Sequence, residues 1–488
     1  MPTDKQNRPK ARLPRGFRDR TAAEIAAERQ TLDTIRKVYE AYGFEPLETP
    51  AFEYTDALGK FLPDVDRPNE GVFSLQDDDK QWLSLRYDLT APLARYVAEN
   101  FQALPKPFRR YQMGSVWRNE KPGPGRYREF TQFDADTVGS NSPSADAELL
   151  MMVCDALEAV GLKRGEYSVN LNHRKIVDGA LEVANVDMSK RGTVLRAIDK
   201  LDRLGIDGVR QLLGRGRKDE SGDFTQGAGL AGEQIEIVLA QVQPAMTGGS
   251  PRAGLTASVS MAVTDGPSGT KGHQELREIF QLVAAAGYND GRINVDFSVI
   301  RGLEYYTGAV FEAQLKIPVQ NDAGEEIIFG SVAGGGRYDD LVARFTGQQV
   351  PATGISIGVS RLLSALKSRS RPALAPLVVV LSLDDPQASF KMSAELRAAG
   401  IRAETYVGTR KFGDQLKYAD KRGAAIAVIE GGDERAAGTV TLKDLALGAE
   451  LSKSIESRAD WVQDRPAQKT VARADLVASV KAMLERRR

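Results

Sequence analysis

The stretch that most restricts the fold of this chain is residues 117–139, WRNEKPGPGRYREFTQFDADTVG. We predict a strand that ends near Arg118, a turn rich in proline and glycine, and a second strand from Tyr127 to Val138. Side chains alternate between the two faces of a strand. An unbroken second strand therefore places cations, an aromatic ring, an amide and carboxylates on one face: Arg126, Arg128, Phe130, Gln132, Asp134 and Asp136.

This row of side chains has two interpretations. It suits a nucleotide that stacks between Phe130 and an arginine, with other arginines on phosphate and with Gln132 and Asp136 on a polar second substrate. It also describes a solvated hairpin with ion pairs along one face, and the hairpin alone favours this second interpretation. The remaining segments of the chain reverse that preference.

Composition limits the chemistry and the number of domains. A chain of 488 residues is too long for one ordinary core, so we expect two or three domains. A single cysteine, Cys154, and two histidines, His173 and His273, argue against disulfides, zinc sites and a Ser-His-Asp triad. Sixty-six basic and sixty-six acidic residues cancel, which neither indicates nor excludes a polyanionic partner. We expect chemistry that uses Arg, Asp, Glu, Gln, Tyr and bound metal.

The sequence does not predict secretion or a membrane span. Residues 1–16 contain no apolar segment like that of a secretory signal. No run approaches the roughly twenty apolar residues of a transmembrane helix. Hydrophobic content of 42% and charged content of 27% are typical of soluble globular proteins, so we expect a cytoplasmic location.

A long helix and a short strand are predicted near the N-terminus. The helix runs from about Thr21 to Tyr42 and begins with a capping box between Thr21 and Glu24. Residues 44–50 follow as an edge strand, because their prolines cannot lie in a central strand. This pair of elements is a reasonable dimer interface, and it is equally an ordinary core element.

Two further helices are predicted before residue 174. Residues 83–95 pass from a strand into a helix with Asp88 and Thr90 at the junction, where plain capping of the helix is the simpler interpretation. A second amphipathic helix begins at Ser142 and includes Cys154 as a small buried residue.

The rest of the chain consists of a predicted insertion, a segment with renewed strand signals and a further predicted domain. Residues 174–290 predict a mainly helical insertion, whose basic turns either touch nucleic acid or are solvated loops. Strand signals return over residues 293–313, and three glycines at 334–336 permit close approach of backbone to a ligand, without the ending of a P-loop. Arg361 lies in the first turns of a later helix. Residues 376–488 alternate strand and helix, which predicts a small, mostly parallel α/β domain.

Five segments in this order resemble the class II aminoacyl-tRNA synthetases, and specifically the histidyl-tRNA synthetase family, across nearly the whole chain. Residues 118–136 resemble the second signature motif of the class, residues 351–366 the third, and residues 21–50 the weakly defined first motif. RGLEYYTG (301–308) and GGGRYDDL (334–341) resemble the two histidine-specific segments of the family.

The resemblance implies an α+β fold. This fold has a class II synthetase antiparallel sheet with flanking helices, a mainly helical insertion and a C-terminal α/β anticodon-binding domain. The implied catalytic domain covers residues 1–173 and 291–367, the insertion 174–290, and the anticodon-binding domain 376–488. A homodimer is also implied.

The implied reaction has two steps and uses ATP with Mg²⁺. Histidine attacks the α-phosphate of ATP to give histidyl-adenylate and pyrophosphate, and the histidyl group then passes to the terminal adenosine of tRNA(His). The histidine carboxylate is already a nucleophile at pH 7, so no base on the enzyme is required. Positioning and phosphate neutralisation should therefore contribute most of the rate.

The resemblance also assigns roles to residues. The implied catalytic cations are Arg118, between the histidine carboxylate and the α-phosphate, and Arg301, which neutralises the α-phosphate where other class II enzymes use a further metal ion. The resemblance implies four ATP contacts in addition to Arg118. Phe130 and Arg361 would contact the two faces of adenine, Glu120 its amino group, and Arg126 the γ-phosphate. The implied histidine contacts are Asp88, Thr90, Arg118, Gln132, Asp136, Arg301, Tyr305, Tyr306 and Tyr338.

Two positions depart from the usual pattern of the family. Asp136 stands where many bacterial members carry glutamate, so we expect a water between it and the amino group of histidine. The turn KPGPG (121–125) lacks the arginine and amide usual in the loop that meets the tRNA acceptor end, where Lys121 and Gly123 are the implied contacts. We hypothesise that this chain does not need the extra 5′ guanosine of tRNA(His) and depends more on the anticodon.

Two rival interpretations belong to other functional classes. The regulatory subunit that binds histidine for ATP phosphoribosyltransferase shares the fold, but it lacks the anticodon-binding domain and has degraded ATP motifs. This chain has that domain and keeps the arginines of the motifs: Arg118, Arg126, Arg301 and Arg361. A nucleic-acid-binding regulator built on a synthetase body would bind nucleic acid without pyrophosphate exchange, and the sequence does not favour it.

Overall fold

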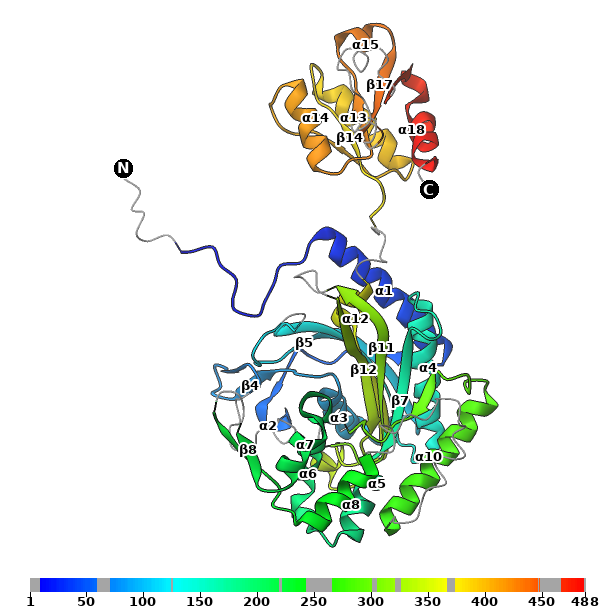
Figure 1. The fold of residues 1–488 in the computed structure, drawn as a ribbon. Helices are drawn as coiled ribbons and strands as arrows, with labels where there is room; N and C mark the ends of the chain where they lie inside the picture. The colour runs from blue at the N-terminus through cyan, green and yellow to red at the C-terminus, as the bar shows by residue number, and fades with distance from the viewer. Residues whose placement is uncertain are drawn as a thin grey trace. The chain divides into compact units, whose positions relative to one another are not determined.

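The structure is a computed structural model. It describes residues 9–58, 71–123, 126–218, 222–242, 266–300, 305–320, 326–366, 374–445, 447 and 467–486. Residues 1–372 and 373–488 form two compact units. The first unit contains an eight-stranded sheet and the second a five-stranded sheet (Figure 1). Within the described ranges, no helix is long and apolar enough to cross a bilayer.

The central sheet of the first unit is mainly antiparallel. Its strand order is β1-β5-β6-β13-β12-β11-β7-β10, and only the outer strands β1 and β10 pair in parallel. The strands in that order are Glu45–Pro46, Phe108–Trp117, Glu129–Val138, Ala352–Gly358, Glu326–Arg337, Ala309–Gln320, Tyr167–His173 and Ile293–Val295. Strand β1 lies at the sheet edge, as predicted for a segment with proline.

Four helices cover one face of this sheet: α1 (Ala22–Ala41), α4 (Pro143–Ala159), α10 (Pro267–Ala285) and α12 (Val359–Leu366). Figure 1 shows α4 and α10 beside β7 and β11. Thr21 caps α1 and forms the predicted capping box with Glu24. Phe133 and Ala135 of β6 point into the core under these helices, where Cys154 is fully buried.

The predicted hairpin is confirmed with shifted bounds. Strand β6 begins at Glu129, two residues later than predicted, so Arg126 and Arg128 lie outside the strand. Residues Gln132, Asp134 and Asp136 are only 8%, 2% and 1% exposed. The interpretation of this row as a solvated face is therefore wrong.

Smaller elements complete the first unit. Strands β2 (Phe52–Tyr54), β4 (Trp82–Leu85) and β3 (Ser74–Gln76) form a three-stranded sheet. Helices α2 (Thr55–Leu58), α3 (Thr90–Asn100) and α11 (Ala343–Thr346) pack near it. Helix α3 begins where the strand-to-helix transition was predicted, with Asp88 and Thr90 at the junction.

Residues 174–242 are largely helical, as the composition predicted. Their helices share a separate hydrophobic cluster: α5 (Arg174–Val183), α6 (Arg191–Ile198), α7 (Leu201–Leu213) and α8 (Gly232–Val242). Strands β8 (Gly216–Lys218) and β9 (Phe224–Gln226) form a hairpin. Helix α10 packs on both α5 and α4 and adds Leu276 and Ile279 to the main core. The insertion boundaries 174–290 stay a prediction.

The second unit is an α/β domain with a mixed sheet of order β15-β14-β16-β17-β18. Pairing is parallel among the first three strands and antiparallel among the last three, so "mostly parallel" was only partly right. In chain order its elements are β14 (Val378–Val380), α13 (Pro386–Ala398), β15 (Ala403–Thr405), α14 (Phe412–Lys421), β16 (Ile426–Ile429), α15 (Gly432–Ala436), β17 (Thr439–Asp444), β18 (Gln468–Ala472) and α18 (Leu476–Glu485).

Candidate active site

A cavity of about 360 Å³ lies on the face of the central sheet opposite to the four covering helices. Strand β6 explains this placement, because its alternate side chains line the cavity while Phe133 and Ala135 enter the core. Most of the predicted site residues line it: Asp88, Thr90, Arg118, Phe130, Gln132, Asp136, Tyr305, Tyr306, Tyr338 and Arg361. Segments far apart in the sequence therefore contribute to one site.

Asp136 is held between two buried groups. Strand β5 pairs with β6 so that Arg110 lies directly across from Asp136, and Arg110 Nη2 is 2.8 Å from Asp136 Oδ2. The Tyr338 hydroxyl donates to Asp136 Oδ1 at 2.5 Å. On the other side β13 places Gly354 opposite, where a Cβ would lie 1.9 Å from Asp136 Oδ1. Only glycine at position 354 leaves room for this carboxylate.

Three aromatic rings form one wall of the cavity. The centroids of the Tyr305 and Tyr306 rings are 4.8 Å apart, and those of Tyr305 and Tyr338 are 5.9 Å apart, both in edge-to-face geometry. The hydroxyl of Tyr338 is already directed to Asp136. These tyrosines form an apolar and polarizable surface beside the buried carboxylates.

Among the described residues that line the cavity, three buried acceptor oxygens have neither a hydrogen-bond nor an ion-pair partner: Asp88 Oδ2, Gln132 Oε1 and Asp134 Oδ1. The other polar atom of two of these side chains is already used. Asp88 Oδ1 accepts from the backbone N–H of Ala91 at 3.0 Å, so it does cap α3, and Gln132 Nε2 donates to Ser356 Oγ at 2.6 Å. A buried acceptor without a donor is unfavourable, so the cavity suits a ligand that brings several N–H donors.

Burial raises the pKa of Asp88, Asp134 and Asp136 above the usual range for aspartate. For Asp134, burial is the largest cause and the nearby negative charge of Asp136 adds to it, which together raise its pKa to about 8 despite the opposing charge of Arg110. A cationic ligand would reverse this effect, because a positive charge favours ionised carboxylates. The cavity is therefore better suited to a ligand with positive charge than to a purely anionic one.

The cavity also has a site for a planar ring and an anion. The Arg118 guanidinium carbon lies 5.1 Å from the centroid of the Phe130 ring. Its Nε donates to the carbonyl oxygen of Tyr87 at 3.2 Å. Arg361, near the start of α12, lines the same cavity. A ring, two arginines and a glycine-lined strand are the groups expected around a nucleotide.

Comparisons with known proteins agree with this arrangement. Residues 16–362 match the family model described as histidyl-tRNA synthetase, and residues 377–465 match the model described as anticodon binding domain. The chain belongs to the histidyl-tRNA synthetase family. It is a histidine–tRNA ligase, an enzyme of the aminoacyl-tRNA synthetase class.

Relatives in this family are similar over almost the whole chain. A histidine–tRNA ligase from Rhizobium leguminosarum bv. trifolii is 57% identical over 496 residues, which cover 99% of this chain and 97% of the relative. One from Brucella ovis is 55% identical over 493 residues, with 99% and 97% covered. The crystal structure of histidyl-tRNA synthetase from Nostoc sp. PCC 7120 matches with a TM-score of 0.72 at 31% identity and covers 99% of this chain and 100% of that one.

Five residues that the family resemblance singled out do not line the cavity. Glu120, Lys121, Gly123 and Arg126 are exposed on the connection between β5 and β6. Arg301 lies outside the described residues. The roles of these residues stay predictions.

No role was assigned from the sequence to three residues of the site: Asp134 and Glu312, which line the cavity, and Arg110 behind it. Asp134 belongs to the alternating row of β6. Arg110 and Gln112 alternate in the same way along β5, so their polar side chains were a second signal for the site in the sequence. Within the described ranges, no three or more His, Cys, Asp or Glu side chains are arranged to hold a metal ion.

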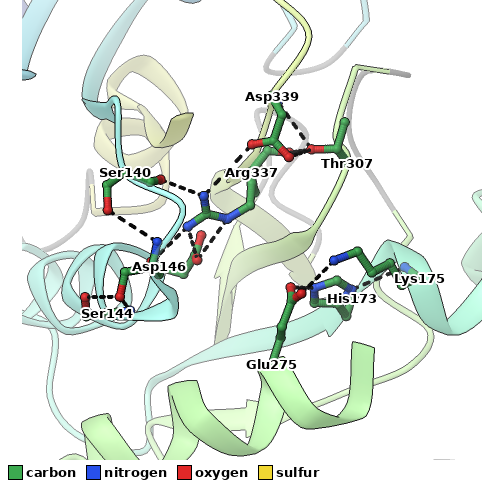
Figure 2. Close-up of polar contacts among 10 residues, drawn as sticks. Ser140, Ser144, Asp146, His173, Lys175, Glu275, Thr307, Arg337 and Asp339 are labelled. Carbon is green, nitrogen blue, oxygen red and sulfur yellow. Dashed lines mark hydrogen bonds and ion pairs between the residues drawn. The ribbon is translucent and has the colours of Figure 1, made fainter. Parts of the chain in front are cut away.

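Arg337 and Asp146 form a buried ion pair (Figure 2) next to the backbone of two of the tyrosines. Arg337, at the end of β12 and directly before Tyr338, contacts Asp146 of α4 through Nη2 at 2.5 Å and Nε at 3.2 Å. Its Nη1 donates to the carbonyl oxygen of Ser140 at 2.8 Å. The backbone carbonyl of Arg337 accepts from Thr307 N–H at 2.8 Å, directly after Tyr306. The side chain of Arg337 thus anchors the chain directly before Tyr338, and its backbone carbonyl holds the chain directly after Tyr306.

We expect replacement of Asp146 by alanine to destabilise the first unit by about 3–5 kcal/mol, because it leaves the buried Arg337 charge with only the carboxylate of Asp339, 3.9 Å away. The side chains of Asp146 and Arg337 are 2% and 8% exposed, so solvent cannot compensate. Urea unfolding measures this change. The control is Asp33→Ala, which removes ion pairs to Arg36 and Lys37 at an aspartate whose side chain is 49% exposed. Equal effects of the two changes would contradict the expectation.

Proposed function

We propose that this cavity carries out the activation step of the ligase reaction. The histidine carboxylate attacks the α-phosphorus of ATP, the bond from that phosphorus to the pyrophosphate oxygen breaks, and histidyl-adenylate and pyrophosphate form. The histidyl group then passes to the 3′-terminal adenosine of tRNA(His), and AMP leaves. The observation that carries the proposal is the set of three unpartnered buried acceptors beside three tyrosines.

In this proposal the histidine side of the cavity matches the donors of the substrate. The ammonium group has three donors and the imidazole ring has at least one, whereas Asp88 Oδ2, Gln132 Oε1 and Asp134 Oδ1 are acceptors without partners among the described residues. Tyr305 and Tyr306 would pack against the imidazole, with Thr90 and Tyr338 completing the histidine contacts. Asp136 is used by Arg110 and Tyr338, which supports an indirect role for it.

The nucleotide side follows from the remaining groups. Phe130 and Arg361 would bind the two faces of adenine, and Arg118 would bridge the histidine carboxylate and the α-phosphate as charge develops there. We further propose that Glu120 and Arg126 approach ATP from the hairpin and that Arg301 neutralises the α-phosphate. Magnesium would accompany ATP, because Mg²⁺ is usually held by substrate phosphates with one or two carboxylates.

We keep the organisation implied by the family as part of the proposal. The catalytic domain would cover residues 1–173 and 291–367, the insertion 174–290, and the anticodon-binding domain 376–488. The matches of the two family models support the separation of the anticodon-binding domain from the preceding part of the chain. A homodimer formed around α1 and β1, and a cytoplasmic location where charged tRNA is used, complete the proposal.

The hairpin turn bears on how tRNA is recognised. Lys121 and Gly123 are exposed, as contacts for an acceptor end require. We expect tRNA(His) transcripts with and without the extra 5′ guanosine to be charged at similar rates, because lysine and glycine cannot reproduce a bidentate arginine contact. Charging kinetics on the two transcripts measure this. A large loss without the guanosine would contradict the hypothesis.

The activation step is tested by exchange of labelled pyrophosphate into ATP. Exchange that requires histidine and ignores the other amino acids would support the proposal. Histidine binding without any exchange would refute it and would point to a regulatory role for the cavity instead.

A further inference from the structure

Residues 14–19, which we call the N-terminal strap, cross the base of the hairpin that joins β5 to β6. The backbone N–H of Arg128 donates to the carbonyl oxygen of Gly16 at 2.8 Å. The guanidinium carbon of Arg18 lies 4.6 Å from the centroid of the Tyr127 ring. The strap therefore contacts two consecutive residues of the hairpin directly before β6 begins.

Gly16 lies between the two arms of the hairpin. A Cβ at this position would be 2.8 Å from Cγ of Arg128 and 3.3 Å from Cβ of Pro122. The φ angle of Gly16 is +84°, which side chains other than glycine rarely adopt. Both the backbone and the space at this position therefore require glycine.

Two contacts hold the strap to the body of the first unit. The ring centroids of Phe17, in the strap, and Phe73 are 5.8 Å apart. On the side of the hairpin, the guanidinium carbon of Arg128 lies 5.9 Å from the same Phe73 ring. Arg18 also forms an ion pair of 3.0 Å with Glu24 in the first turn of α1. The strap and the hairpin thus share Phe73 as a common support.

We propose that the N-terminal strap positions residues 119–123 and 126–128 of this hairpin for ATP and for tRNA. This inference rests on the proposed function, in which Glu120 and Arg126 approach ATP and Lys121 and Gly123 approach the acceptor end. The hairpin fixes its own shape through backbone hydrogen bonds between Gly123 and Arg126 and between Arg118 and Arg128. Its placement depends on neighbouring segments, which are the strap and Gly71. Histidine contacts further along β6 are held by the sheet on both sides, and Arg118 is anchored outside the hairpin by the Tyr87 carbonyl, so the strap should not affect histidine binding.

The first test is Gly16→Ala compared with Gly287→Ala. Gly287 has the same φ of +84°, and a Cβ there would meet nothing within 4 Å, so the control carries the backbone strain without the hairpin contact. We expect Gly16→Ala to raise the KM for ATP and for tRNA by at least about tenfold, because small misplacements of binding groups are costly. The KM for histidine should stay at the wild-type value, and Gly287→Ala should change none of the three.

A second measurement does not depend on activity. We expect trypsin to cleave the Arg126–Tyr127 bond faster in Gly16→Ala and Arg18→Ala than in wild type or Gly287→Ala, because the released hairpin opens more often. The effects of Arg18→Ala and Tyr127→Ala on the KM for ATP should be non-additive in the double variant, since each removes the same contact.

The outcomes separate this inference from the proposed function. Equal cleavage in Gly16→Ala and Gly287→Ala, or a rise in all three KM values together, would overturn the role of the strap. Faster cleavage in a protein whose wild type shows no pyrophosphate exchange would support the strap as a hairpin support and refute the proposed function, because cleavage reports hairpin order alone.

Discussion

Replacement of Arg118 by alanine is expected to lower the kcat of histidine-dependent pyrophosphate exchange by about 10²- to 10³-fold, the usual effect of removing one preorganised donor from a developing charge. Arg118 lines the cavity beside Phe130. Among the described residues only its Nε makes a hydrogen bond, to the carbonyl of Tyr87, so both Nη groups are left for ligand oxygens. Stability should change by less than about 1 kcal/mol.

The matched control is Arg397→Ala in the second unit. Arg397 also donates to a single backbone carbonyl, that of Ala403, and exchange does not involve tRNA, so this variant should keep wild-type exchange. Arg118→Lys should recover only part of the loss, because an ammonium cannot make the bidentate contact. Exchange at the wild-type rate in Arg118→Ala would refute the assigned role. Arg301→Ala is expected to show a comparable loss.

Replacement of Asp134 by asparagine is expected to raise the KM for histidine by about 10- to 100-fold, which corresponds to one lost charge-assisted hydrogen bond. The change keeps the shape of the side chain and removes its charge. Asp134 is 2% exposed, lines the cavity and has an unpartnered Oδ1. The groups that face it are Asp88, Asp136, Arg86, Arg110 and Ser356.

The same substitution should make the folded protein more stable. With a pKa of about 8, Asp134 keeps its proton in the folded protein over a range of pH where the unfolded chain has lost it. The contribution of Asp134 to stability therefore falls as pH rises from about 4 to about 8, and asparagine removes this contribution. We expect Asp134→Asn to exceed wild type by about 1–3 kcal/mol at pH 8 and by much less at pH 4.5.

Two measurements check this pair of expectations. Urea unfolding at several pH values should show a difference between Asp134→Asn and wild type that grows with pH. The KM for histidine should fall in wild type between pH 6.5 and about 8, as the cation displaces the proton, and should not fall in the variant. Asp414→Asn, an exposed carboxylate on α14, serves as the control for both. A difference in stability independent of pH would contradict the role of the buried proton.

Local geometry explains why much of the cavity was predictable. Alternation along β6 depends only on the backbone, so Gln132 and Asp136 could be assigned to one face without knowing the rest of the fold. Whether that face meets solvent or a cavity depends on partners that are distant in sequence. Strand β13, which lies beside β6 and supplies Ser356 opposite Asp134, comes from residues 352–358. Such pairing is not visible in a local pattern.

Arg110 is a residue whose role in the site could not be predicted from the sequence. It is a fully buried cation in β5, and it contributes to the site only because the β5–β6 register places it across from Asp136. Asp134 was identified in the row but received no role, because its significance depends on burial and on the charge of Asp136 beside it. Both omissions concern electrostatics in three dimensions, whereas the predicted strand and helix boundaries concern the chain alone.

The order of strands in the central sheet has a consequence for how the protein is made. The second neighbour of strand β6 in the sheet is β13, which follows it in the chain by roughly 210 residues. A ribosome that adds about 5–20 residues per second needs roughly 10–40 s to synthesise this interval. During that time one side of β6 is an open strand edge, which can pair with other chains. The yield of this protein in a cell should therefore depend on chaperones that shield nascent chains.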